Sequence, residues 1–164
     1  MQRSVAVIMV LLCLAWQTGA RAEDESLSNR LVKATQPILN YALNLLGAPY
    51  KFGGNDPEKG MDCSGYVRHV YKEAADIDLP RSAKAISEKG RKIDDNELKP
   101  GDLVFFNTMR KAFSHVGIYA GNDKFVHATS SRTGTVMVSD MKEGYWAKRY
   151  NGARRVIAND PGIN

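Results

Sequence analysis

The sequence predicts an α+β fold, because helical and strand-like patterns occupy different parts of the chain. Apolar residues recur at helical spacing in the first half, and short runs of strand character follow from residue 102 onward. Segments that alternate between helix and strand would instead predict a parallel α/β sheet. The order of the two patterns therefore favours a domain whose helices come first and whose strands come later.

The first 22 residues have the pattern of a secretory signal peptide. Arg3 gives a basic start, residues 5–16 are apolar, and residues 20–22 have the small residues of a cleavage site. We expect export and cleavage after Ala22. Lipid anchoring through Cys13 is less favoured, because the bulky Leu12 precedes it. The apolar run is too short to span a bilayer, and no later segment is long enough.

Removal of this segment leaves 142 residues, enough for one domain, with a net charge of +3. The basic residues are not interleaved with aromatic residues and glycines, so we expect no nucleic-acid partner. A mildly cationic surface would tolerate an anionic polymer such as cell wall. No assembly motif is evident, and we expect a monomer.

Cys63 is the single cysteine left after cleavage, so an internal disulfide is impossible. A lone thiol in an oxidising compartment suggests intermolecular pairing or catalysis, although a buried inert cysteine is the common alternative. Its place in the sequence favours catalysis. Asp62 is a predicted N-cap, and helical spacing follows it at Val67, Val70, Tyr71 and Ala74. At a helix start we expect the thiol pKa to be lowered.

The remaining elements are predicted in order. Residues 23–35 form a flexible lead-in, and the domain spans residues 36–164. A helix has Pro37 in its first turn and ends at Gly47, and residues 48–60 form a loop rich in glycine and proline. Ser82 caps a short helix that continues to Lys89. Five strands are then predicted, at residues 102–106, 114–120, 124–128, 133–138 and 154–158.

Two histidines fall in consecutive predicted strands. His115 shares a strand face with Gly117, and a loop of three residues, 121–123, would pair Ala120 with Lys124. That register places Gly117 opposite His127, with both imidazoles on one face. A loop of two residues would turn His127 to the other face.

Cys63, His115 and His127 together suggest a nucleophile, its base and the group that orients the base. His69, six residues beyond Cys63 on the predicted helix, is expected to face elsewhere. The competing interpretation is a zinc site with one cysteine and two histidines. It is less favoured because the sequence has no short pair of metal ligands. Activity that chelators abolish and thiol alkylation spares would reverse that order.

Several motifs, in their order and spacing, resemble the NlpC family of bacterial cell-wall cysteine peptidases, and in particular its Spr-type murein endopeptidases. They occupy residues 47–54, 62–65, 79–82, 100–105, 115–119, 125–128 and 145–150. The resemblance implies a papain-like α+β fold, in which N-terminal helices pack on a central antiparallel β-sheet. It implies hydrolysis of amide bonds in peptidoglycan stem peptides or their cross-links, in the periplasm, with no metal or other cofactor.

The resemblance also assigns residues. Cys63 is the nucleophile, His115 the base and His127 the polar third member. The substrate side is assigned to Tyr50, Asp62, Ser64, Arg81 and Ser82. Two other functions remain open: a non-catalytic wall-binding module, and a thiol-dependent acyl or peptidyl transferase. The products of a reaction with murein separate the three.

Overall fold

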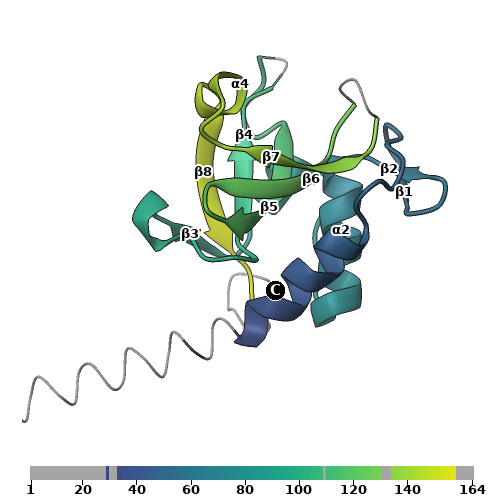
Figure 1. The fold of residues 1–164 in the computed structure, drawn as a ribbon, viewed down its shortest axis with the longest axis horizontal. Helices are drawn as coiled ribbons and strands as arrows, with labels where there is room; N and C mark the ends of the chain where they lie inside the picture. Colours follow the sequence, from purple (N-terminus) through teal and green to yellow (C-terminus); the bar gives the residue numbers. More distant parts are fainter. Residues whose placement is uncertain (1–28, 30–32, 109, 131–133, 158–164) are drawn as a thin grey trace, which may run out of the picture. The chain divides into compact units, whose positions relative to one another are not determined.

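The computed structural model describes residue 29 and residues 33–108, 110–130 and 134–157. The chain divides into two units, Met1–Lys33 and Ala34–Asn164, and the fold described here is that of the second (Figure 1). The predicted signal peptide at residues 1–22 lies outside the described residues.

The first helix is helical over residues 33–44 and therefore begins before Pro37, where its first turn was predicted. Residues 33–35 belong to it although they were assigned to the lead-in. The reason is packing: Thr35 is only 3% exposed and lies against Gly101, where an added Cβ would come within 2.6 Å of the Thr35 Cβ. A turn through Gly47, with φ +85°, follows the helix.

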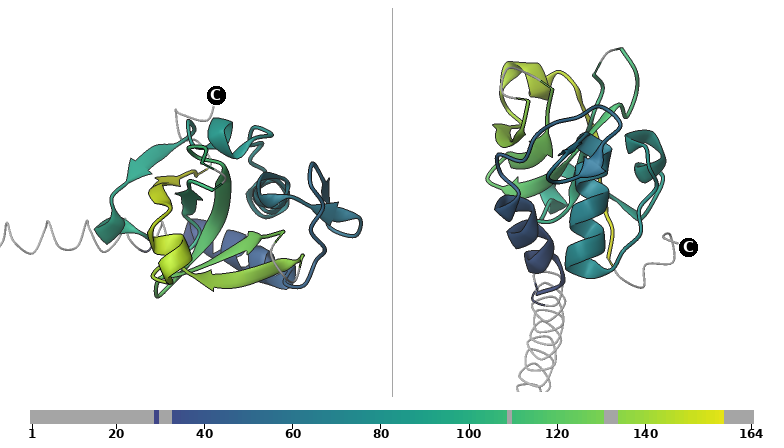
Figure 2. Two further views of the ribbon diagram at one scale, coloured as in Figure 1. Left: turned by 90° about the horizontal axis from the view of Figure 1, so that it is seen from above. Right: turned by 90° about the vertical axis from the view of Figure 1, so that its right-hand side faces the viewer.

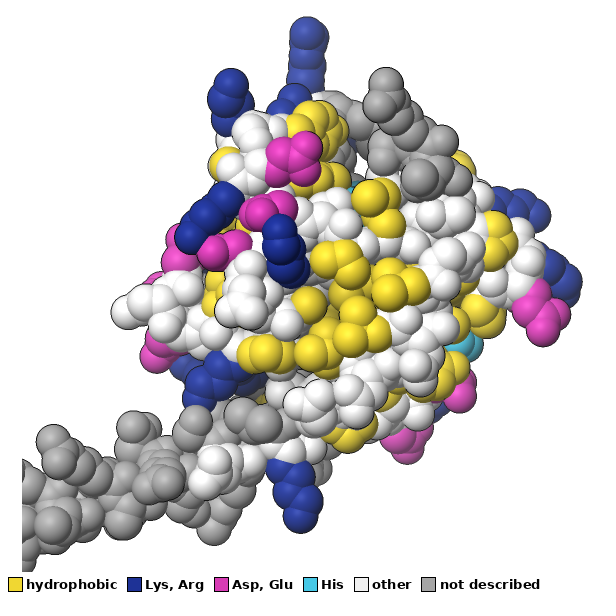
Figure 3. All heavy atoms as spheres, viewed as in Figure 1, with side chains coloured by type: hydrophobic (Ala, Val, Ile, Leu, Met, Phe, Trp, Pro, Cys, Tyr) yellow, Lys and Arg dark blue, Asp and Glu magenta, His cyan; other side chains and the backbone are white. Residues whose placement is uncertain are grey.

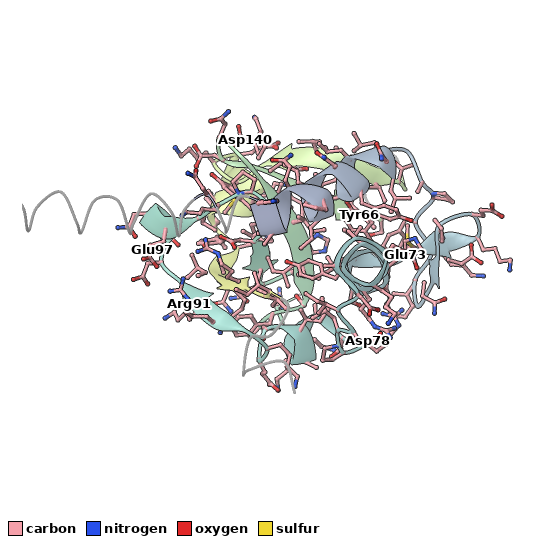
Figure 4. All side chains as sticks on the ribbon, turned by 90° about the horizontal axis from the view of Figure 1, so that it is seen from below. Tyr66, Glu73, Asp78, Arg91, Glu97 and Asp140 are labelled. Atoms are coloured by element: carbon pink, nitrogen blue, oxygen red, sulfur yellow. The ribbon has the colours of Figure 1, made fainter. Side chains whose placement is uncertain are left out.

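Helix α2, Cys63–Ala75, begins where the sequence predicts. The side chain of its N-cap, Asp62, accepts a hydrogen bond from the backbone N–H of Gly65. Two buried tyrosines fasten α2 to its neighbours: the Tyr66 hydroxyl donates to the Ala42 carbonyl of the first helix, and the Tyr71 hydroxyl donates to the Gly101 carbonyl. Figure 4 shows Tyr66 pointing from α2 toward the first helix. These contacts fix the axis of the helix that carries the cysteine.

Three small elements surround this helix start. Strands β1, Asn55–Asp56, and β2, Gly60–Met61, form a two-stranded ribbon within the predicted loop. Helix α3, Ala83–Ile86, has the predicted Ser82 cap but is shorter than expected. A 3-10 helix, η1, covers Asp95–Glu97. Only the cap of α3, and not its length, followed from the sequence.

The other strands form one antiparallel six-stranded sheet in the order β3-β8-β4-β5-β6-β7. Their bounds are Arg91–Ile93 (β3), Leu103–Phe106 (β4), His115–Gly121 (β5), Lys124–Ala128 (β6), Val136–Asp140 (β7) and Tyr150–Arg155 (β8). A fourth helix, α4, spans Gly144–Ala147. The α+β prediction is confirmed, whereas β3 was not predicted.

The sheet has an apolar core on each face. On one face, Val116 and Ile118 of β5 pack with Val67 and Val70 of α2 and with Ile38 of the first helix. Figure 2 shows these two helices side by side along the sheet. On the other face, aromatic residues of the sheet and α4 pack together, namely Phe106, Tyr119, Phe125 and Trp146. Because neighbouring residues in a strand point to opposite faces, His115 and His127 belong to the second face.

The hairpin of β5 and β6 reaches the predicted register by another route. Gly121 pairs with Lys124, so the loop has two residues and the predicted pair of Ala120 with Lys124 is wrong. A β-bulge between Tyr119 and Gly121 adds one unpaired residue to β5 and so compensates for the shorter loop. Tyr119 then pairs with Phe125, as the predicted register requires. An added Cβ on Gly117 would come within 3.2 Å of the His127 Cβ. Only a glycine there leaves room beside the histidine.

The surface of the described residues carries charges of both signs. In Figure 3, basic and acidic side chains are dispersed around a central apolar area rather than forming one basic stripe. The described part of the chain contains no helix with the length and apolar character that crossing a membrane requires.

Candidate active site

Cys63 is the first residue of α2, and its thiol is free and half-buried. Backbone N–H groups of Val116, Ser64 and Cys63 itself lie near enough to the sulfur to favour its thiolate form. The Val116 N–H comes from β5, directly after His115. The start of the helix and the start of the strand therefore meet at the sulfur.

The resting state of this sulfur differs from the prediction. Burial has the largest effect and, against the N–H groups, raises the pKa of the Cys63 thiol to about 11. The Asp62 carboxylate adds to the increase. The expected lowered pKa is therefore wrong, because removal of the sulfur from water outweighs the helix start. At neutral pH, Cys63 is a thiol that needs a base.

The two predicted histidines are hydrogen bonded to each other. Nε2 of His115 lies 2.8 Å from Nδ1 of His127, and Nε2 of His127 lies 2.9 Å from Oγ of Ser139 on β7. Because Nε2 of His115 is engaged with His127, Nδ1 is the ring nitrogen left to exchange a proton with a thiol. The sequence correctly places both rings on one face of the hairpin.

The histidine rings are enclosed by aromatic side chains. His115 is 9% exposed and His127 is fully buried. Phe125 stacks on His127 with ring centroids 4.6 Å apart, and Trp146 contacts both imidazoles. Burial lowers the pKa of His115 to about 4; burial and then the charge of His115 lower the pKa of His127 to about 2. Both rings are consequently neutral at pH 7, and Nδ1 of His115 is available as a proton acceptor.

A second network surrounds the Asp62 cap. The Asp62 carboxylate accepts hydrogen bonds from Gly53 N–H at 3.0 Å and Gly65 N–H at 2.7 Å, and from the Ser64 hydroxyl at 3.0 Å. Arg81 contacts both carboxylate oxygens, at 2.9 and 2.7 Å. Burial opposes ionisation of Asp62, but these hydrogen bonds outweigh it and lower the pKa of the carboxyl. The network holds the loop of Gly53 against the start of α2.

The other predicted substrate-side residues lie around this network. Arg81 also donates to the Ser64 hydroxyl at 2.8 Å, so its planar fork binds Asp62 and Ser64 in this structure. Ser82 accepts a hydrogen bond from Ala85 N–H at 3.2 Å and thereby caps α3. Burial, with a smaller effect from Cys63, raises the pKa of Tyr50. In this structure, Arg81 and Ser82 therefore make hydrogen bonds within the protein.

A cleft of about 1250 Å³ joins these groups. Its lining includes Cys63 and His115 together with all five residues that the sequence assigned to the substrate side. Lys111 and Phe113 approach from the loop between β4 and β5, and Glu143 and Tyr145 from the region of α4. The cleft is large enough for a peptide of a few residues, and the thiol opens into it.

Two residues near the histidines were not predicted as site residues. Ser139 was missed because the last strand before α4 was expected to end at residue 138, and β7 continues to Asp140. Trp146 lies on α4, where a tryptophan in a short apolar segment gives no separate signal for contact with a histidine. The strand pattern of residues 136–140 could have identified Ser139.

His69 is not among the residues that line the cleft, and it faces elsewhere as expected. It is half-buried on α2, and its Nε2 lies 3.2 Å from the Tyr41 hydroxyl of the first helix. Among the described residues, no group of three or more His, Cys, Asp or Glu side chains is arranged to hold a metal ion. The facing nitrogens of His115 and His127 share a hydrogen bond instead.

A thiol and a buried imidazole on one cleft, with a second polar group behind the imidazole, define the arrangement used by cysteine hydrolases. Comparison with known proteins shows the family. Residues 47–155 match the NlpC/P60 family. The chain belongs to that family.

Curated relatives of known name have similar sequences. The Murein DD-endopeptidase MepS/Murein LD-carboxypeptidase of Escherichia coli K12 is 41% identical over 143 residues, which cover 86% of this chain and 74% of that protein. Murein DD-endopeptidase MepH of the same strain is 42% identical over 132 residues, 78% of this chain and 48% of MepH. The Gamma-DL-glutamyl hydrolase of Bacillus subtilis is 43% identical over 74% of this chain and 29% of its own length. The chain thus spans about half of MepH and less than a third of that hydrolase.

Solved structures have the same fold. An NLP/P60 family protein of Staphylococcus aureus superimposes with a TM-score of 0.68 and 36% identity, covering 77% of this chain and 42% of that one. The NlpC/p60 domain of the peptidoglycan hydrolase SagA has a TM-score of 0.64 and 30% identity, covering 74% of this chain and 98% of that domain.

Proposed function

We propose that this chain is a peptidoglycan endopeptidase that hydrolyses amide bonds in stem peptides or in the cross-links between them. The observation that supports this most is the joint placement of Cys63 and His115 on one cleft, with His127 hydrogen bonded behind His115. Relatives that are 41% and 42% identical are named murein DD-endopeptidases, which points to the substrate.

The proposed reaction begins with a neutral thiol and a neutral imidazole. As Sγ of Cys63 attacks the carbonyl carbon of the scissile amide, its proton moves to Nδ1 of His115. The C–N bond then breaks, and the leaving amine takes that proton. Water attacks the resulting thioester, again with loss of a proton to His115. The C–S bond breaks and Sγ takes the proton back from His115, which restores the thiol. The product leaves as a carboxylic acid that ionises to the carboxylate by releasing its proton to solvent.

Backbone N–H groups at the helix start are suited to stabilise the charge that develops on the substrate carbonyl oxygen. The N–H groups of Cys63 and Ser64 at this helix start lie near the sulfur and favour negative charge there. Donors fixed by a capped helix need no rearrangement during the reaction, which is the basis of oxyanion stabilisation. In this proposal Asp62, Ser64, Arg81, Ser82 and Tyr50 form the adjoining wall that receives the substrate.

The proposed substrate lies in the bacterial cell envelope, so we also propose export to the periplasm through the signal peptide predicted at residues 1–22, and action as a monomer. The intact mass of the protein recovered from the cell envelope tests the first point, because cleavage after Ala22 would remove residues 1–22. Light scattering of the same preparation tests the second.

Digestion of purified murein tests the proposed activity. The processed protein is incubated with murein, and the released fragments are identified by mass, with Cys63→Ala as the matched control. Conversion of cross-linked dimers to monomers would indicate cleavage of cross-links, and shortened stems would indicate cleavage within the stem. Products joined to an added amine would indicate a transferase. No product from the unmodified protein would support the wall-binding alternative.

A further inference from the structure

Ser139, His127 and His115 form a line of hydrogen bonds that ends at the cleft. The distances are 2.9 Å from Ser139 Oγ to His127 Nε2 and 2.8 Å from His127 Nδ1 to His115 Nε2. A neutral imidazole carries one N–H and one free nitrogen. Each ring therefore donates at one nitrogen and accepts at the other, so the direction of one hydrogen bond fixes the direction of the next.

Two arrangements of donors and acceptors are compatible with these two hydrogen bonds. If Ser139 accepts a hydrogen bond from Nε2–H of His127, then Nδ1 of His127 accepts from Nε2–H of His115, and Nδ1 of His115 is a free base. If Ser139 donates instead, both rings reverse and Nδ1 of His115 carries a proton. The second arrangement cannot remove a proton from Cys63, so the direction of the bond at Ser139 decides whether the site is active.

We infer that Ser139 is a positioning residue, which accepts from Nε2–H of His127 and so keeps Nδ1 of His115 unprotonated. This inference rests on the proposed function, since it assigns the base of that reaction. Ser139 acts through His127 and does not have to touch the substrate.

The sheet holds Ser139 in place for this role. Strand β7 pairs with β6 so that Phe125 faces Ser139 and His127 faces Met137. Ser139 is then the diagonal neighbour of His127 on the same face. The next residue, Asp140, is fastened to β6 by Lys124 at 2.6 Å. A hydroxyl at this position is presented to the histidine by two fixed strands, and an alanine would remove the partner of His127 Nε2.

The test compares Ser139→Ala with Ser139→Thr, which keeps the hydroxyl. Val138→Ser, at the neighbouring exposed position of β7, is the control for disturbance of the strand. Two readouts need no peptidoglycan: the ¹⁵N chemical shifts of the imidazole nitrogens, which distinguish the tautomers, and the rate at which iodoacetamide alkylates Cys63 at pH 7. Turnover of muropeptides is measured in parallel.

Ser139→Ala is expected to slow alkylation and kcat about tenfold, the scale that one neutral hydrogen bond provides, with KM unchanged. A protonated Nδ1 on His115 should appear in its ¹⁵N spectrum. Ser139→Thr and Val138→Ser should match the unmodified protein. Unchanged tautomers and alkylation in a folded Ser139→Ala protein would overturn the inference. If the unmodified protein failed to cleave murein, the proposed function would fail, whereas the tautomer and alkylation results would still decide the role of Ser139.

Discussion

His115 and His127 share a hydrogen bond of 2.8 Å in which neither ring carries a charge at neutral pH. Burial lowers the pKa of both, and it raises the pKa of the Cys63 thiol at the same time. Cys63, His115 and His127 are therefore all uncharged before the substrate binds. A proton must move from sulfur to nitrogen during the attack, and each part of the site can be tested by how it affects that transfer.

Loss of the second histidine should impair the base without removing it. In His127→Ala, Nε2 of His115 loses its partner and the ring can turn, so we expect kcat to fall on the order of 100-fold. The kcat of His127→Asn should fall less, because the asparagine amide can still hydrogen bond His115. Kinetics with soluble muropeptides measure both. His69→Ala is the matched control, and a loss as large as that of His127→Ala would argue against a special role for the pair.

The pH dependence of kcat/KM should follow His115. Its imidazole accepts a proton only while it is neutral, and its lowered pKa of about 4 keeps it neutral across most of the pH range. Activity should therefore be nearly constant from pH 8 to about pH 5 and fall only as the pH drops through about 4. A fall centred near pH 6.5, the ordinary value for histidine, would show that His115 is more hydrated in solution than in this structure.

Arg81 should contribute to the stability of the fold through its hydrogen bonds to Asp62. Arg81→Ala removes hydrogen bonds to Asp62, Ser64 and Gly54, so we expect a stability loss of about 1 kcal/mol, a modest value because the arginine side chain is 41% exposed.

Turnover by Arg81→Ala should fall with the loosening of the helix cap. Arg81→Lys keeps the charge but not the planar fork, and should recover only part of the loss. Urea unfolding and muropeptide kinetics measure the two effects. Wild-type turnover in Arg81→Ala would leave Arg81 as a surface ion pair without a functional role.

Gly65 should not tolerate a side chain. A Cβ there would overlap the carbonyl oxygen of Gly54, which packs over the start of α2. We expect Gly65→Ala to cost about 1–3 kcal/mol of unfolding free energy and to reduce activity by displacing the loop. Gly144→Ala is the control, since nothing lies within 4 Å of its added Cβ. Equal stability of the two variants would contradict the close approach.

The sequence was sufficient where a local rule decides the structure. Asp62 has the side chain and spacing of an N-cap, so the start of α2 followed from it directly. The face shared by His115 and His127 was also correct, although a bulge between Tyr119 and Gly121 produced it instead of a longer loop. Both side chains stayed on the predicted face because the bulge added one residue to β5 and the loop was one residue shorter than predicted.

Features that depend on tertiary burial did not follow from the sequence. The pKa of Cys63 is set by how much protein surrounds the sulfur, and spacing along the chain carries no information about that. Ser139 was missed because its strand was predicted to end at residue 138, two residues before the observed end at Asp140. Strand β3 is only three residues long, Arg91–Ile93, and has no apolar alternation to mark it. Its position is fixed by pairing with β8.

Nucleophilic catalysis by Cys63 requires a covalent acyl intermediate on its sulfur, which can be measured directly. The protein is mixed with a defined stem peptide, quenched in acid within milliseconds to seconds, and analysed by intact mass and peptide mapping. We expect a transient increase in mass equal to that of the acyl half of the substrate, located on the peptide that contains Cys63 and absent from Cys63→Ala. Full turnover by Cys63→Ala, or by an alkylated protein that chelators inactivate, would contradict covalent catalysis by Cys63.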